Sequence, residues 1–140
     1  MGRDEGFLRL YRAASLVALA GFAGVGLAFL FMPDQALAGL NGLGERLGLP
    51  AGPVQGRDLY LSLAVGYMYV VALLAWLMFR NPRVAMFPLL LTHAKLATSA
   101  LSFYLAVSDA PYMMYLANGV GDGLIGLAAL AFYLRVRRLA

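Results

Sequence analysis

Two long apolar runs of this sequence carry charged side chains that could do chemistry. The run LTHAKLATS, at 91–99, contains Lys95 and the only histidine of the chain, His93. The run LANGVGDGLIG, at 116–126, contains Asp122 next to small and apolar residues. An ionisable residue deep in an apolar segment is costly, so it pairs with an opposite charge or serves a ligand or a proton path. Lys95 and Asp122 are therefore the first candidates for a functional site.

The composition indicates which class of protein must position these charges. Of 140 residues, 62% are hydrophobic and 13% are charged, and the mean hydropathy is +0.76, whereas a soluble domain carries about 25% charged residues. The hydrophobic residues fall into four runs, each close to the ~20 residues that cross a membrane as a helix. We interpret residues 13–32, 59–79, 84–107 and 111–134 as the spans of a single membrane domain, 1–140. The predicted fold class is an all-α integral membrane protein, a four-transmembrane-helix antiparallel bundle.

The first span has an alternative interpretation as a cleaved signal peptide, because Ala36-Leu37-Ala38 has the form of a cleavage site. The apolar region of a signal peptide is only about 7 to 15 residues long, so the length of this run favours a span. In length and span number the chain resembles small bacterial four-helix membrane proteins, including DoxX-like ones. That likeness implies no residue role and no activity for this chain.

The connections between the spans differ in length. Short connections join spans two to three and three to four, which makes those helices antiparallel neighbours. The segment 33–58 is longer, and in it Asp34 is a candidate helix cap, while Leu37, Leu40 and Leu47 lie broadly on one side of a helix. A short interfacial helix between spans one and two and a plain glycine-rich loop are both compatible with this segment.

Small residues at helical spacing predict close helix packing; they are Ala20, Gly24 and Ala28 in span one and Gly119, Gly123 and Gly126 in span four.

The arginines predict the orientation in the membrane. One side would carry Arg3, Arg9, Arg12, Arg80, Arg83, Arg135, Arg137 and Arg138, and the other only Arg46 and Arg57. The positive-inside bias then places both termini in the cytoplasm, with the protein in the inner (cytoplasmic) membrane. The lipid bilayer is the expected partner of the positive charge. No basic run is interleaved with base-stacking aromatics, so we expect no nucleic-acid binding.

Lys95 and Asp122 lie at matching depths in their predicted spans. Counted from the cytoplasmic ends of spans three and four at ~1.5 Å per residue, Lys95 lies roughly 16 Å deep and Asp122 roughly 18 Å deep. A lone charge at the centre of a span costs ~2.5 to 3.5 kcal/mol, and pairing removes much of that cost. The sequence therefore predicts a Lys95–Asp122 ion pair near the bilayer midplane.

Further polar residues share faces with this pair at ~100° per residue. The face in span three holds Thr92, Lys95, Ser99 and Ser102, with Thr98 at its edge; that in span four holds Tyr115, Asn118 and Asp122; and span two offers Asp58, Ser62, Gly66 and Tyr69 for the outer end. We call this predicted arrangement the polar seam. It contains the candidates for ligand binding or proton relay: Lys95, Asp122, Asn118, Ser99, Tyr115 and Thr92, with Asp58 and Tyr69 secondary.

His93 is a secondary candidate of a different kind. It lies ~200° around the helix from Lys95, so it points away from the polar seam, and a hydrogen bond to a neighbouring helix is the expected role. One histidine cannot supply a bis-histidine haem, and a chain without cysteine cannot supply thiolate ligands. We therefore predict no cofactor and no metal site.

Three classes of function remain open. The first is a membrane bundle that functions as an oligomer. Its polar seam binds a small or lipophilic ligand or relays protons. The alternative is a non-catalytic subunit or assembly factor of a larger membrane complex, in which the ion pair is purely structural. The third is a membrane enzyme acting on a lipophilic substrate such as a quinone or isoprenoid. The chain shows no known catalytic motif, which favours the first two hypotheses over the enzyme.

Overall fold

The computed structural model describes residues 2–54 and 59–139. Within them the chain forms helices and no strands: α1 (Gly2–Phe31), α2 (Pro33–Arg46), α3 (Leu59–Arg80), α4 (Met86–Ser108) and α5 (Met113–Val136). By length and composition, α1, α3, α4 and α5 could each cross a membrane. The prediction of an all-α chain with four long apolar helices is confirmed for the described residues, and α2 is an additional short helix.

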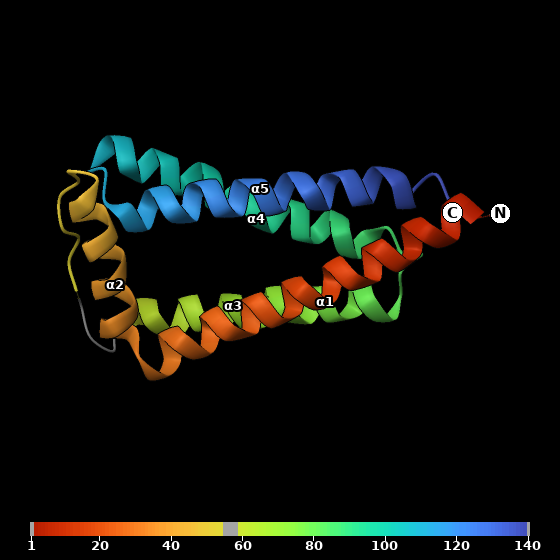
Figure 1. Cartoon of the computed structure of the whole chain (residues 1–140), viewed down its shortest axis with the longest axis horizontal. Helices are drawn as coiled ribbons and strands as arrows, with labels where there is room; N and C mark the ends of the chain where they lie inside the picture. Colours follow the sequence, from red (N-terminus) through yellow and green to blue (C-terminus); the bar gives the residue numbers. More distant parts are fainter. Residues whose placement is uncertain (1, 55–58, 140) are drawn as a thin grey trace.

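The four long helices are arranged as two pairs that lie side by side (Figure 1). The most extensive contacts join α4 to α5 and α1 to α3, and α3 meets α4 over a smaller area. Both termini lie at the end of the bundle where α3 connects to α4, while α2 crosses the opposite end from one pair to the other (Figure 1). The molecule is therefore two helical hairpins, each made from consecutive apolar helices.

α1 begins at Gly2, well before the predicted span 13–32. The additional turns are stabilised by an aromatic stripe, because Phe7 and Tyr11 lie one turn apart on the side that faces α5. The ring of Phe132 lies 6.1 Å from that of Phe7 and 5.1 Å from that of Tyr11. The arginine-containing N-terminal segment is thus helical because its apolar face is packed, although its charges place it outside an apolar span.

The first part of the segment between the first two predicted spans forms a helix, α2, and not a glycine-rich loop. It begins with Pro33 at its first position, where a fixed φ and a missing N–H cost nothing. The predicted cap at Asp34 is wrong: Met32 occupies the cap position without a side-chain hydrogen bond, and Asp34 lies in the first turn. A carboxylate there is still favourable, since it faces the positive end of the helix dipole.

The chain reverses direction after α2, and the segment that follows is hydrogen-bonded to α2. Gly48 has a φ of +72°, a left-handed conformation that suits glycine at a helix end. Two hydrogen bonds of 2.9 Å then join the Asn41 side-chain amide to the backbone of Gly52. Of the three leucines expected on one side, Leu37 and Leu40 are half-buried, while Leu47 is exposed.

Close packing between α4 and α5 depends on the predicted glycines of α5. A Cβ atom added at Gly126 would lie 2.7 Å from Leu96 Cδ2 and 3.2 Å from the Leu96 backbone nitrogen, and one at Gly123 would lie 2.9 Å from the Ser99 hydroxyl. The small residues of α1 behave differently, because Gly24 is exposed with open space around it. The α5 backbone can therefore approach α4 closely enough for short polar side chains to meet between them.

Candidate functional site

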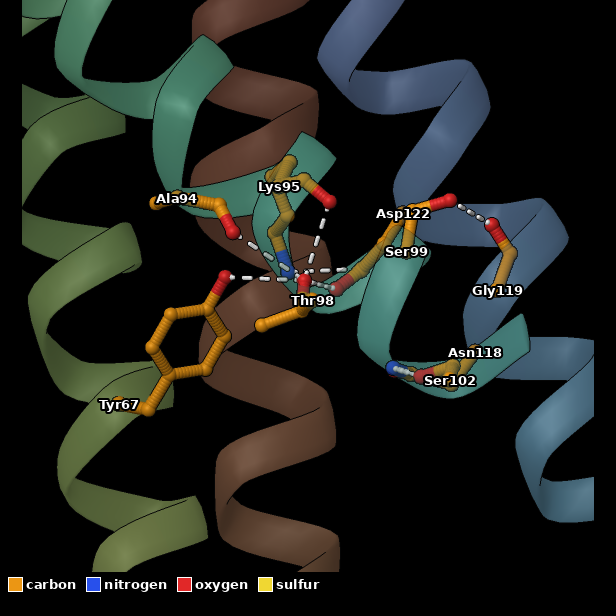
Figure 2. Close-up of polar contacts among 9 residues, drawn as sticks. All are labelled: Tyr67, Ala94, Lys95, Thr98, Ser99, Ser102, Asn118, Gly119 and Asp122. Carbon is orange, nitrogen blue, oxygen red and sulfur yellow. Dashed lines mark hydrogen bonds and ion pairs between the residues drawn. The ribbon is translucent and has the colours of Figure 1, made fainter. Parts of the chain in front are cut away.

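Lys95 of α4 and Asp122 of α5 are in direct contact in the interior of the bundle. Lys95 Nζ lies 2.8 Å from Asp122 Oδ1. Lys95 is 1% exposed and Asp122 is 6% exposed. Figure 2 shows that the two side chains approach each other from neighbouring helices. A charge pair this well buried is stabilised mainly by mutual attraction and hydrogen bonds, which offset the loss of solvation.

Aromatic rings from the other helix pair cover the lysine ammonium. Lys95 Nζ lies 4.6 Å from the ring centroid of Phe22, on α1, and 5.0 Å from that of Tyr67, on α3. A desolvated cation–π contact contributes about 2 kcal/mol. All four long helices therefore contribute a side chain to the environment of this one charge, and Lys95 connects the α4/α5 pair to the α1/α3 pair.

The second carboxylate oxygen of Asp122 is also occupied. The Thr98 hydroxyl donates a hydrogen bond to Asp122 Oδ2, and the Tyr67 hydroxyl lies 3.5 Å from the Thr98 hydroxyl. Figure 2 shows Tyr67 reaching from α3 toward Thr98 on α4. The carboxylate is thus bonded through both oxygens, and Thr98, expected only at the edge of the seam, belongs to its centre.

A second set of polar contacts joins α4 to α5 closer to α2. The Ser99 hydroxyl donates to the Gly119 carbonyl at 2.7 Å, and the Asn118 amide donates to the Ser102 hydroxyl at 2.8 Å. Asn118 is the exposed member of this set, whereas both serines are buried. Figure 2 shows these two contacts beside the ion pair, each between α4 and α5.

The structure separates other predicted site residues from this cluster. Thr92 is buried on the same face of α4, but its hydroxyl donates to the Pro88 carbonyl of its own helix at 2.8 Å. Tyr115 is half-buried, and its ring lies 5.7 Å from that of Tyr112. Neither side chain contacts Lys95 or Asp122 through a hydrogen bond among the described residues.

His93 lies outside the cluster, as predicted from its position on α4. It is exposed, and its Nδ1 atom lies 3.1 Å from the Leu89 carbonyl of the same helix. The predicted hydrogen bond to a neighbouring helix is therefore wrong. The geometric reason is that a residue on the outer face of α4 reaches the carbonyl one turn earlier more easily than a neighbouring helix.

The predicted contribution of α3 to the seam came from the wrong face of that helix. Ser62 and Gly66 are exposed, and Tyr69 is 69% exposed; Asp58 lies outside the described residues. The face that packs inward instead carries Tyr67 and Val71, followed by Ala75 and Met78. Apolar packing fixed the rotation of α3, and the polar residues were left outside.

Phe22 and Tyr67 are the site residues that the sequence analysis missed. Tyr67, Val71, Ala75 and Met78 recur every three or four residues, a spacing that could have identified the buried face of α3. Phe22 carries no such signal, because the whole of α1 around it is apolar. Its role depends on Lys95, which reaches it across the boundary between the two helix pairs.

A lateral groove of about 650 Å³ lies between α1 and α5, and Phe22 is one of its wall residues. Its walls are almost entirely apolar; they include Ala14, Gly21 and Phe22 of α1, Leu91 of α4, and Ile125 and Ala129 of α5. Phe22 thus has one side toward the groove and lies over Lys95 with its ring. The groove and the ion pair are adjacent sites separated by one aromatic side chain.

The described residues do not bring together three or more His, Cys, Asp or Glu side chains in a way that could hold a metal ion. Comparison with models of protein families, with curated proteins and with solved structures finds no match for this chain. The groove, the ion pair and Phe22 between them are the features of this chain that bear on its function.

Proposed function

We propose that this protein is a small bacterial-type membrane protein that binds a lipophilic molecule in the groove between α1 and α5. The observation that carries the proposal is the position of Phe22, which lines the apolar groove and covers the Lys95 ammonium at 4.6 Å. A groove of about 650 Å³ with apolar walls suits a hydrocarbon chain, and binding sites of this size commonly combine apolar walls with few polar groups.

In this proposal Lys95 and Asp122 supply the polar end of the site. A ligand with a carbonyl or hydroxyl group would reach the ammonium once the Phe22 ring moves, since that ring separates the two. Thr98 orients Asp122 through its hydrogen bond to the carboxylate. Ser99 and Asn118 hold α4 against α5 beside the pair, through their bonds to the Gly119 carbonyl and the Ser102 hydroxyl. Proton relay through the same pair stays a prediction, as do oligomer formation and action on a quinone or isoprenoid.

The proposal includes a location in the cytoplasmic membrane with both termini on the cytoplasmic side. Its support is the arginine distribution: Arg9 and Arg12 on α1 and Arg83 after α3 lie at the end of the bundle that carries the termini. Lys and Arg accumulate on the cytoplasmic side of membrane proteins. The groove would then open sideways into the hydrocarbon region of the bilayer.

The test is to fill the groove and measure labelling by a lipophilic probe. A Cβ at Gly21 would meet open space, and Gly21 lines the groove, so Gly21→Trp should fill it without a backbone clash. The purified protein would be irradiated with a long-chain alcohol that carries a diazirine, and the labelled peptides would be mapped. We expect labelling of residues that line the groove in the original protein, and its loss in Gly21→Trp.

Gly24→Trp is the matched control, because Gly24 lies on the same helix with open space around it and is not among the groove residues. It should leave the labelling of the groove unchanged. Equal labelling of the two variants would mean that the probe reports general contact with the lipid-facing surface, and the binding proposal would be wrong.

A second candidate function is favoured by one specific observation, the complete bonding of the buried ion pair. Both oxygens of Asp122 have partners, and Lys95 is enclosed by a carboxylate and two rings. A pair bonded in this way is compatible with a purely structural role, in which it joins the helices of a non-catalytic subunit or assembly factor. In that case replacing the pair by apolar residues would leave probe labelling of the groove unchanged.

A further inference from the structure

A second cavity lies at the end of the bundle that carries the termini. It has a volume of about 630 Å³ and lies between the N-terminal part of α1 and the connection from α3 to α4. Its walls include Arg9 and Arg12 of α1 and Arg83 of the connection, together with Glu5. The remaining wall residues are uncharged, so the cavity combines a small apolar surface with three guanidinium groups.

The positive charge of this cavity is not neutralised by the described acidic residues around it. The ion pairs of the described chain are Lys95–Asp122 and Arg135–Asp4, so Asp4, the acid next to Glu5, is bonded elsewhere at 3.0 Å. Glu5 is the single carboxylate in the wall, against three arginines. Arg9 and Arg12 lie three residues apart and so project from the same side of α1. The cavity therefore has an excess of positive charge that converges from two elements.

Arginine is well suited to one class of ligand in such a setting. Its planar guanidinium binds phosphate oxygens through two parallel hydrogen bonds, and it is less strongly hydrated than a lysine ammonium. Basic pockets between membrane helices near the cytoplasmic surface typically bind the headgroups of anionic lipids. This cavity has the three features that such binding needs: several arginines, an apolar wall and a place at the ends of the helices.

We propose that this cavity is a binding site for a phosphate-bearing anion, supplied by the headgroup of an anionic phospholipid. Arg9, Arg12 and Arg83 hold the phosphate, and Leu8 and Val84 contact the adjoining glycerol and acyl region. The site is independent of the lipophilic-ligand proposal, because the cavity and the lateral groove share no wall residue. Failure of either proposal would leave the other intact.

The experiment measures lipid binding to the full-length protein in phosphatidylcholine micelles to which phosphatidylglycerol is added. The triple variant Arg9→Gln/Arg12→Gln/Arg83→Gln removes the three guanidinium groups. The expected loss of affinity for phosphatidylglycerol is on the order of fivefold for each arginine removed, with little change for phosphatidylcholine. Native mass spectrometry of the retained lipid gives the dissociation constants.

The matched control removes the same charge at other positions near the same end of the bundle. Arg80→Gln/Arg137→Gln/Arg138→Gln has the same net charge as the first variant, and none of its three positions lines the cavity. Its affinity for phosphatidylglycerol should stay close to that of the original protein. An equal loss in both triple variants would mean that the lipid responds to diffuse surface charge, and the proposed site would be wrong.

Two further measurements cover an unstable triple variant and distinguish a lipid headgroup from soluble phosphate. Arg83 lies outside the helices, so Arg83→Gln should fold normally and still show one fivefold step if the triple variant is unstable. Inorganic phosphate is added in pure phosphatidylcholine at matched ionic strength, with chloride as reference. If phosphate raises the melting temperature as much as phosphatidylglycerol does, the ligand is a soluble phosphate, and the lipid assignment is overturned.

Discussion

At Lys95, one carboxylate and two aromatic rings replace the water that would normally surround a positive charge. The carboxylate comes from the partner helix α5, and the rings come from α1 and α3. Removing one member of a buried ion pair leaves the other without compensation, whereas replacing both by apolar residues is often neutral or stabilising. The pair therefore offers a direct test of how α4 and α5 are joined.

We expect Lys95→Met and Asp122→Leu each to destabilise the bundle by about 3 to 5 kcal/mol. The double variant should recover most of that loss, because two apolar side chains suit a helix contact inside a membrane. Stability would be measured by unfolding in mixed micelles of increasing SDS content. Thr92→Val is the control, since the Thr92 hydroxyl bonds only its own helix, and it should change stability little.

The double variant also separates the two candidate functions. Loss of groove labelling in a stable double variant would support a ligand role for the pair, while unchanged labelling would support the structural role. A double variant no more stable than the sum of the two single effects would show that Lys95 and Asp122 are not coupled. That result would contradict the contact on which both functions depend.

The meeting of Lys95 and Asp122 could be predicted from the sequence because it depends on two simple quantities. Depth follows from the count of residues in each span, and adjacency follows from the short connection between them. Phe22 and Tyr67 could not be placed in the same way. Their contact with Lys95 depends on how α1 and α3 are rotated, and hydropathy does not distinguish an apolar face against lipid from one against another helix.

At the scale of elements, the distance between α4 and α5 is set by glycine. The Ser99 hydroxyl reaches the Gly119 carbonyl because neither Gly119 nor Gly123 places a side chain between the helices. The same stripe contains Gly126, which faces Leu96. Small residues in α5 therefore determine whether the polar contacts of the site can form at all.

We predict opposite effects for two alanine substitutions in α5. Gly126→Ala places a methyl group 2.7 Å from Leu96 Cδ2 and 3.2 Å from its backbone nitrogen, so it should destabilise the bundle by about 1 to 3 kcal/mol. Gly121→Ala meets open space and should stabilise by up to about 1 kcal/mol through helix propensity. SDS unfolding of both variants measures the difference; a neutral Gly126→Ala would mean that α4 and α5 lie farther apart.

The helix boundaries were predictable where an apolar run ends at charge or proline, as in α3, α4 and α5. α1 was not, because its first turns contain both arginines and a packed aromatic stripe of Phe7 and Tyr11. Charge dominated the interpretation of that segment, but burial of one face decides whether a helix forms. Burial also decided the rotation of α3, whose apolar face packs inward while Ser62 and Tyr69 are exposed.

At the scale of the whole molecule, the proposed orientation can be tested because the chain contains no cysteine. Single cysteines at the exposed positions Ala51 and Ser108 should react with a membrane-impermeant maleimide in intact cells. Cysteines at the exposed positions Asn81 and Val84 should react only after the membrane is opened. The reason is that arginine-rich ends remain in the cytoplasm. The reverse pattern would overturn the proposed topology and the cytoplasmic location of the basic cavity.

The division into two hairpins has a consequence for how the protein is made. Lys95 and Asp122 lie on consecutive helices of the same hairpin, joined by a connection of few residues. During synthesis α4 leaves the ribosome with an uncompensated positive charge, and its counter-charge follows only with α5. We therefore expect the translocon to release α4 and α5 into the bilayer together, as one neutral unit. The first hairpin can enter on its own, and its rings then enclose a charge that its neighbour has already neutralised.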